Sequence, residues 1–246
     1  MNAVSEKRKI LVTGVSGDIG SFIASEFIRK GWIVLGLDKK EMVSADSTIE
    51  FYKCDLGNYT ETETIINSIV DKHGAFDVVI NCAGMIVNAP IVSIVNGKFT
   101  SHDPKTWNDI ITANLSTTFN VSTIAVKHMI VNRKKGVIIN ISSIIANGNA
   151  GQTAYSSAKA GVNGFTKSLA KELGQFGIRV VCISPGFFDT DSTKQNISET
   201  KLSQIKEAIP LKKLGDVSEI VQTIEYVINT DYINGAIIEL NGGLAL

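Results

Sequence analysis

Short apolar runs alternate with amphipathic stretches along almost the whole chain. The runs have the length of buried strands and lie at residues 9–13, 32–38, 50–56, 76–84, 137–141, 178–185 and 235–240. Between them, apolar residues recur at helical spacing, as in Ile19, Ile23 and Phe27. Continuous apolar strands separated by such helices are typical of a parallel sheet that is covered on both faces. The pattern therefore predicts an α/β fold with a doubly wound parallel sheet of about seven strands and helices on both faces.

Two segments interrupt this alternation. Residues 85–104 contain two prolines and a glycine, and we expect them to be irregular. Residues 191–215 are polar, and we expect them to form a mobile lid over the substrate. The longer helices are expected at about residues 105–133, 155–175 and 216–228. No repeat or change of composition marks a boundary, so residues 1–246 are expected to form a single domain.

Charge and cysteine content narrow the possible partners. The 24 basic and 24 acidic residues cancel, so no long-range field favours nucleic acid or an anionic membrane surface. No apolar run reaches transmembrane length, and the start of the chain lacks the long apolar region of a secretory signal. Cys54, Cys82 and Cys182 lie far apart in apolar runs, which suits reduced thiols better than disulfides or a metal site. We expect a cytoplasmic protein that acts on a small molecule, with no metal, nucleic-acid or membrane partner.

A glycine-rich turn joins the first predicted strand to the first helix. It reads Gly14-Val-Ser-Gly-Asp-Ile-Gly20, and Asp38 ends the next strand about twenty residues later. Glycines let the backbone approach a pyrophosphate, and the N-terminus of the following helix faces its negative charge. Asp38 can accept hydrogen bonds from the adenosine ribose and would repel a 2′-phosphate, which favours NAD over NADP, although Lys39 and Lys40 follow it.

Other chemically useful residues also stand where predicted strands end. With the first glycine of the turn, this group consists of Gly14, Asp38, Asp55, Asn81 and Ser143. Ligands of open parallel sheets bind beyond the carboxyl ends of the strands, where the strand order switches. We therefore expect these five residues to share one site.

Tyr155 and Lys159 lie four residues apart at the start of a predicted helix, so their side chains share one face. A phenol titrates near pH 10 in water, and it acts as an acid or base near neutrality only beside a cation that favours the phenolate. Lys159 can supply such a cation, with a bound cofactor as the second positive charge. Because this spacing is common on helices, a catalytic interpretation depends on the residues at the strand ends.

Taken in order, these motifs resemble those of the short-chain dehydrogenase/reductase family. They are Thr13-Gly14 with Gly20, Asp55-Leu56, Asn81-Cys-Ala-Gly84, Asn114, Ser142-Ser143, Tyr155-Ser-Ser-Ala-Lys159, Pro185-Gly186 with Thr190, and Asn241-Gly-Gly243. The single-domain 3-oxoacyl-carrier-protein reductases are especially similar around residues 148–152 and 185–190. The resemblance covers essentially the whole chain and implies a Rossmann-type fold, a nicotinamide cofactor and a homo-oligomer, either a dimer or a tetramer.

The resemblance also implies a role for each matched residue. Tyr155 would exchange a proton with the substrate oxygen, and Lys159 would lower the pKa of Tyr155 and hold the nicotinamide ribose. A serine would bind the substrate oxygen, and Asn114 would hold a water that relays the proton outward. The implied cofactor contacts are Gly14, Ser16, Gly17, Asp18, Ile19, Gly20, Asp38, Asp55, Leu56, Asn81, Ala83, Gly84, Tyr155, Lys159, Pro185, Gly186, Phe188 and Thr190.

Three features depart from the family pattern. Asp18 stands where single-domain members usually have glycine, and the resulting glycine spacing is that of sugar-nucleotide-modifying relatives. Either Ser142 or Ser143 can be the catalytic serine, because the distance to Tyr155 favours the first and the end of the strand favours the second. We favour Ser143. The segment that follows Gly84 is longer than expected for the carrier-protein reductases, and it would lie beside the substrate mouth.

These observations lead to one main hypothesis and two alternatives. The main hypothesis is an oxidoreductase that transfers a hydride between NAD(H) and a 3-oxoacyl or 3-hydroxyacyl thioester or a carbohydrate derivative. One alternative is a sugar-nucleotide epimerase or dehydratase with retained NAD, which the glycine spacing suggests. The other is a non-catalytic dinucleotide-binding protein, because one fold hosts many functions. In each case the apolar end of the chain, residues 243–246, is expected to lie in a subunit interface.

Overall fold

The computed structural model describes residues 7–42 and 49–245. Its strands are β1 (Lys9–Thr13), β2 (Ile33–Asp38), β3 (Glu50–Lys53), β4 (Val78–Asn81), β7 (Gly136–Ile141), β8 (Ile178–Pro185) and β9 (Ile237–Leu240). They form one parallel sheet in the order β3-β2-β1-β4-β7-β8-β9. The order reverses between β1 and β4, which is the switch point of a doubly wound sheet. The predicted fold class is confirmed.

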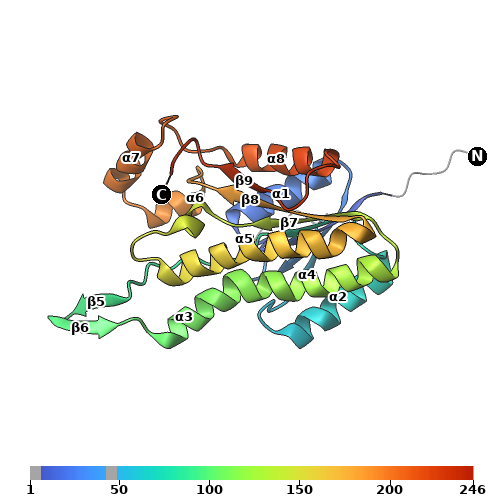
Figure 1. Cartoon of the computed structure of the whole chain (residues 1–246), viewed down its shortest axis with the longest axis horizontal. Coiled ribbons are helices and arrows are strands. Elements are labelled where there is room, and N and C mark those ends of the chain that lie inside the picture. The colour runs from blue at the N-terminus through green and yellow to red at the C-terminus, as the bar shows by residue number, and fades with distance from the viewer. Residues whose placement is uncertain (1–6, 43–48, 246) are drawn as a thin grey trace, which may run out of the picture.

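Helices cover both faces of the sheet (Figure 1). The longer ones are α1 (Asp18–Arg29), α2 (Tyr59–His73), α4 (Thr117–Val131), α5 (Thr153–Leu173) and α8 (Val217–Asn229). Helices α1 and α8 pack together on one face, and α2, α4 and α5 cover the other. Among the described residues, no helix is both long and apolar enough to cross a membrane.

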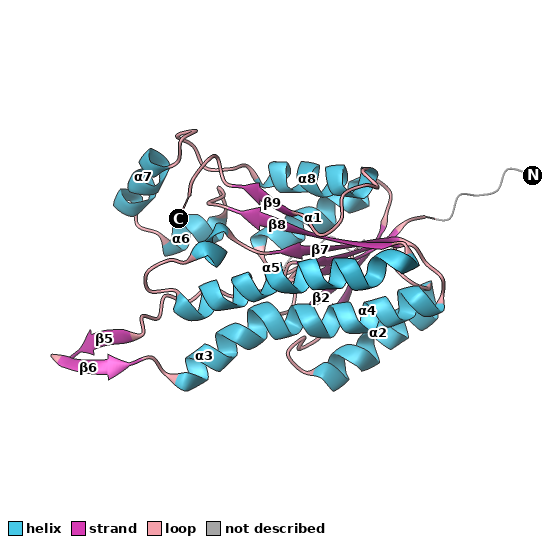
Figure 2. Cartoon of the chain, viewed as in Figure 1, coloured by secondary structure: helices cyan, strands magenta, loops and turns pink. Residues whose placement is uncertain are grey.

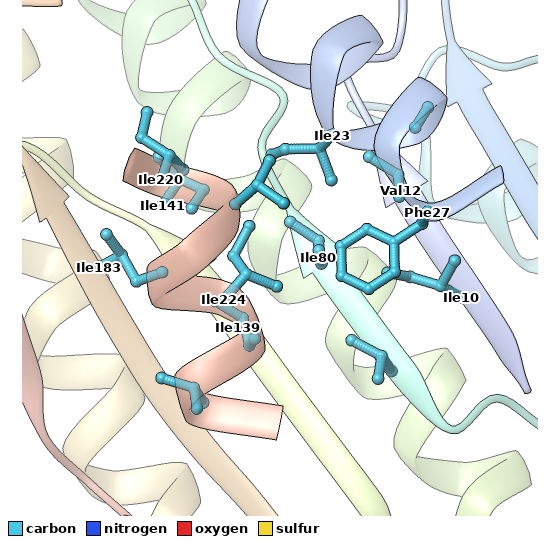
Figure 3. Close-up of a cluster of buried hydrophobic side chains, with 14 of the residues drawn as sticks. Ile10, Val12, Ile23, Phe27, Ile80, Ile139, Ile141, Ile183, Ile220 and Ile224 are labelled. Atoms are coloured by element: carbon cyan, nitrogen blue, oxygen red, sulfur yellow. The ribbon is translucent and has the colours of Figure 1, made fainter. Parts of the chain in front are cut away.

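Alternate residues of each strand enter different cores. Ile10 and Val12 face α1 and α8, whereas Leu11 between them faces the other helix layer. In the first core, Phe27 of α1 and Ile224 of α8 belong to one cluster that also contains Ile80 and Ile139 of the strands (Figure 3). A fully buried aliphatic or aromatic side chain contributes about 1.5–3 kcal/mol relative to its exposed state. Because each strand contributes residues to both cores, the strands are apolar on both faces. The polar residues at the strand ends differ from this pattern.

The helix predicted at about 105–133 is present but is not regular throughout. It consists of α3 (Pro104–Ile111), a π-helical segment (Thr112–Ser116) and α4, which ends at Val131. A π segment inserts one residue into the helical ladder and leaves local carbonyl groups open to other donors. Asn114 lies at the centre of this segment, and its Nδ2 donates to the Ile110 carbonyl at 2.9 Å. Its predicted role in holding a water stays a prediction.

The prediction that residues 85–104 are irregular is wrong in its second half. Strands β5 (Val92–Val95) and β6 (Lys98–Ser101) form an antiparallel hairpin that projects away from the body of the molecule (Figure 2). Its turn is Asn96-Gly97, with φ angles of 50° and 75°. An Asn-Gly pair between β-branched runs is a strong local hairpin signal, because both residues tolerate positive φ. The prediction of an irregular segment rested on the two prolines and the glycine, and it did not use the Asn-Gly signal.

The polar segment 191–215 contains two short helices. They are α6 (Asp191–Asn196) and α7 (Glu199–Ala208), and no residue of either is buried. The segment is anchored beyond α7 by Ile209, which packs with Ile144 and with Leu244 near the end of the chain. Its mobility stays a prediction.

Candidate active site

A cavity of about 1030 Å³ opens at the carboxyl edge of the sheet. It lies beyond the strand ends around the switch point, as expected for an open parallel sheet. The predicted residues that line it are Gly14, Ser16, Gly17, Asp18, Ile19, Gly20, Asp38, Asp55, Leu56, Ala83, Gly84, Asn114, Ser142, Ser143, Tyr155, Lys159, Pro185, Gly186 and Thr190. The two predicted residues outside the lining are Asn81 and Phe188. The structure thus brings together residues from almost every strand end.

Asn81 and Phe188 lie behind the lining. Both side chains are buried. Asn81 Nδ2 donates to Ser122 Oγ at 2.9 Å and to Asn140 Oδ1 at 2.8 Å, which ties β4 to α4 and β7. Phe188 packs closely on Gly215, where an added Cβ would come within 2.6 Å of the ring. Both residues lie behind the cavity wall, and neither lines the cavity.

The glycine turn is built for close approach. Gly14 has a φ of 74°, and its N–H donates to the Leu37 carbonyl at 2.8 Å. A Cβ on Gly20 would lie 2.1 Å from the Gly14 carbonyl oxygen, so only glycine fits there. Gly17 is the N-cap of α1 and has no side chain to satisfy the first N–H groups of the helix. Those N–H groups are available to an anion, so the turn fits a pyrophosphate.

Asp38 is held at the end of β2 by backbone donors. Its Oδ2 accepts from the Ser16 amide at 3.0 Å, and its Oδ1 accepts from the Lys40 amide at 2.9 Å. These bonds fix the carboxylate beside the glycine turn, where it lines the cavity together with Lys39 and Lys40. At the next strand end, Asp55 Oδ1 accepts from the Gly57 amide at 3.0 Å. Two acids therefore line the same part of the cavity.

Lys159 is buried inside the site. Its side chain crosses from α5 to β7, where Nζ donates to the Ile141 carbonyl at 2.8 Å. Burial disfavours the charged form and lowers the pKa of Lys159 to about 8. The ammonium also lies 5.6 Å from the centre of the Tyr155 ring, within cation–π range.

Tyr155 is a neutral phenol in this structure. Burial raises the pKa of Tyr155 to about 12, although a hydrogen bond with Ser143 acts in the opposite direction. The expectation that Lys159 lowers this pKa is therefore not met by the protein alone, because desolvation of the phenolate outweighs the hydrogen bond with Ser143, and Cys82 also raises the pKa. The hydroxyl is a proton donor at neutral pH.

The two serines after β7 have different partners. Ser142 Oγ donates to the Lys159 backbone carbonyl at 3.1 Å and fixes α5 against β7. Ser143 shares a hydrogen bond with Tyr155 and accepts from the Ile145 amide at 3.2 Å. This geometry favours Ser143 as the serine that meets the substrate oxygen.

Asn114 joins the π segment to the chain that follows β4. Its Nδ2 donates to the Ile110 carbonyl at 2.9 Å and to the Met85 carbonyl at 2.8 Å, and its Oδ1 accepts from the Met85 amide at 3.3 Å. A Cβ on Gly84 would lie 2.5 Å from this Oδ1, which explains the glycine. Asn114 thus holds the cavity wall beside Tyr155 and Lys159.

Sequence reasoning gave no site role to two further groups, although Thr13 belongs to the matched glycine motif. Thr13 Oγ1 accepts from the amides of Cys82 and Ala83, both at 3.0 Å, and so joins the ends of β1 and β4. Met85 and Ile86 line the outer cavity and are 36% and 59% exposed, which makes the mouth apolar. For Thr13, the sequence signal was a hydroxyl inside an apolar strand. For Met85 and Ile86, it was an apolar pair directly after Gly84.

Comparisons with known proteins show the family and the fold to which the chain is similar. A family model described as short chain dehydrogenase matches residues 8–201. The chain is 34% identical to a 3-oxoacyl-[acyl-carrier-protein] reductase of Vibrio harveyi, over 97% of this chain and 98% of the relative. It is 32% identical to Nodulation protein G of a Rhizobium species, over 97% of each chain. A solved structure of Thermoplasma acidophilum aldohexose dehydrogenase in ligand-free form superposes with a TM-score of 0.86, at 26% identity over 97% of this chain and 94% of that one.

Proposed function

The chain belongs to the short-chain dehydrogenase/reductase family, and we propose that it transfers a hydride between NAD(H) and a 3-oxoacyl or 3-hydroxyacyl thioester or a carbohydrate derivative. Family membership makes it an oxidoreductase that acts on carbonyl or CH–OH groups with a nicotinamide dinucleotide. The carrying observation is that Ser143, Tyr155 and Lys159 converge in the cavity that contains the glycine turn. The names of the relatives support the two substrate classes.

In the reductive direction, Tyr155 gives its proton to the substrate oxygen. The raised pKa keeps the hydroxyl protonated near neutrality, and Ser143 donates a second hydrogen bond to the same oxygen. Lys159, with a pKa of about 8, remains largely cationic at pH 7 and stabilises the phenolate that results. A dinucleotide held at the glycine turn would supply the hydride. Positioned acid/base groups of this kind contribute about 10²- to 10⁴-fold each.

NAD is proposed in preference to NADP. The support is Asp38, whose fixed carboxylate lines the cavity close to the glycine turn. A 2′-phosphate beside this carboxylate would be repelled, whereas ribose hydroxyls can donate to it. Lys39 and Lys40 also line the cavity, and their positive charges would attract a 2′-phosphate and so favour NADP. Asp55 and Leu56 are proposed to contact the adenine, and Asn114 is proposed to position the water that relays the proton from Lys159.

A homo-oligomer in the cytoplasm is also proposed. Phe119 of α4 is 48% exposed and forms an edge-to-face pair with Phe165 of α5, with ring centres 6.3 Å apart. An aromatic pair on adjacent helices with one exposed ring, that of Phe119, favours a subunit interface, since aromatic residues are enriched there. The free thiols Cys54, Cys82 and Cys182 suit a reducing compartment.

The experiment is a turnover screen that follows nicotinamide absorbance. The wild-type protein is mixed with 3-oxoacyl thioesters or aldoses, with NAD(H) and NADP(H) in parallel. We expect turnover with one of these classes, a higher kcat/KM with NAD(H), and a loss of about 10²- to 10⁴-fold in Tyr155→Phe. Tyr226→Phe, at an exposed position on α8, is the matched control and should match the wild type. No Tyr155-dependent change with any class, or tightly retained NAD without net redox change, would contradict the proposal.

A further inference from the structure

An acid at the glycine turn is bonded to the segment after β8. Asp18 is the first residue of α1 and lines the cavity. Its Oδ2 accepts from the backbone N–H of Ser192 at 2.7 Å, across a sequence separation of 174 residues. Ser192 lies in the first turn of α6, two residues after its N-cap Thr190. The bond therefore connects the proposed pyrophosphate site with the start of the α6–α7 segment.

The local environment keeps Asp18 ionised. Partial burial raises its pKa, but the Ser192 backbone amide and the Ser192 and Thr190 hydroxyls hydrogen-bond the carboxylate and bring its pKa below the ordinary value. A negative charge at this point is unfavourable for a neighbouring pyrophosphate. Donors from Thr190 and Ser192 hydrogen-bond the Asp18 carboxylate and so stabilise its negative charge at the start of α6.

Helix α6 has few other attachments. No residue of α6 is buried, and among the described residues its remaining hydrogen bonds stay within residues 189–197. The ion pair between Lys194 and Asp189, at 2.8 Å, is also local. The next contacts with a hydrophobic cluster along the chain are made by Ile205 of α7, which is partly buried, and by Ile209, which is buried beyond α7. The bond to Asp18 is therefore the hydrogen bond that holds α6 to the glycine turn.

We propose that Asp18 is a positioning residue that straps the start of α6 to the glycine turn and so places Thr190 at the cavity. This inference rests on the proposed dinucleotide site. The acid replaces the glycine expected at this turn position because the carboxylate supplies a bond between the cofactor loop and the segment that covers it. Loss of the strap leaves the glycine turn intact and lets the segment from Thr190 to Ile209 open.

The test compares Asp18→Ala, which removes the strap, with Asp18→Asn, which keeps an acceptor oxygen without the charge. Asp191→Ala is the matched control, because it removes a neighbouring acid that does not bond to the turn. Tryptic cleavage at Lys194 and Lys201 is measured on the full chain without cofactor. In Asp18→Ala we expect cleavage to be about tenfold faster, which is the effect of one charge-assisted hydrogen bond on a local opening equilibrium. Asp18→Asn and Asp191→Ala should stay within about threefold of the wild type.

Binding and turnover provide the second readout. NADH fluorescence gives the dissociation constant, and steady-state kinetics give kcat and KM for the substrate found in the screen. In Asp18→Ala we expect the substrate KM to rise about tenfold with a smaller change in kcat, and Asp18→Asn should restore it. Equal cleavage rates in wild type and Asp18→Ala, or equal losses in Asp18→Ala and Asp18→Asn, would overturn the strap. A wild-type protein that binds no NADH would instead contradict the proposed function, and the cleavage comparison would still decide the strap.

Discussion

The adjacent serines at the end of β7 show how one position along a strand changes the role of a side chain. Successive residues of an extended chain point in opposite directions. Ser142 therefore turns to the Lys159 backbone, and Ser143 turns to the Tyr155 hydroxyl. The first bond holds α5 in place, and the second involves the hydroxyl that is proposed to react.

This difference leads to a prediction for two single substitutions. Ser143→Ala should lower kcat by about 10²- to 10³-fold, since it removes a donor to the oxygen on which charge develops. Ser142→Ala should lower kcat by about tenfold or less and reduce the melting temperature, because it breaks a buried structural bond. Steady-state kinetics and thermal unfolding of the two variants check this. Equal or reversed losses of kcat would assign the catalytic role to Ser142.

At the scale of elements, the hairpin β5–β6 differs from the rest of the fold. Val92, Ile94 and Phe99 are 53%, 67% and 81% exposed, and Ile94 and Phe99 form a cross-strand pair. An isolated two-stranded hairpin is marginally stable in water, so its turn carries much of its stability. The turn Asn96-Gly97 needs positive φ at both positions.

Gly97→Val should therefore open the hairpin without unfolding the protein. A β-branched residue at positive φ costs about 1–2 kcal/mol, enough to make cleavage by chymotrypsin at Phe99 about tenfold faster. The melting temperature should change by about 1 °C or less, because all of β6 is exposed and adds little to the core. Asn96→Gly, which keeps a residue tolerant of positive φ, is the control. A large fall in melting temperature for Gly97→Val would show that the hairpin belongs to the cooperative unit.

At the scale of the whole molecule, the helix layer with α4 and α5 carries the pair of Phe119 and Phe165, in which Phe119 is exposed. Phe119→Glu should place a charge in the proposed interface and lower the mass measured by light scattering to that of the monomer. Phe176→Glu is the control, because Phe176 is 44% exposed near the far end of α5. A wild-type monomer, or the same loss of assembly in both variants, would contradict an interface at α4 and α5.

Local sequence patterns predicted most of the fold and most of the residues that line the cavity. The strands, the glycine turn, Asp38 and the Tyr155–Lys159 pair could be predicted because apolar period, turn chemistry and helical spacing act within a few residues. The Asn-Gly hairpin was equally local, and its signal was present in residues 92–101. The edge at which strand-end residues gather also followed from the alternation of strands and helices.

Tertiary structure decided what depends on distant neighbours. The partners of Ser142 and Ser143 were settled by how α5 crosses the end of β7. The pKa of Tyr155 was raised rather than lowered, because burial is a property of the packed site and not of the lysine spacing. Asp18, whose charge is unfavourable beside a pyrophosphate, accepts a hydrogen bond from the Ser192 amide, 174 residues away in the sequence. Hydrogen-bond partners and desolvation are fixed only when separate elements pack, and no local period encodes them.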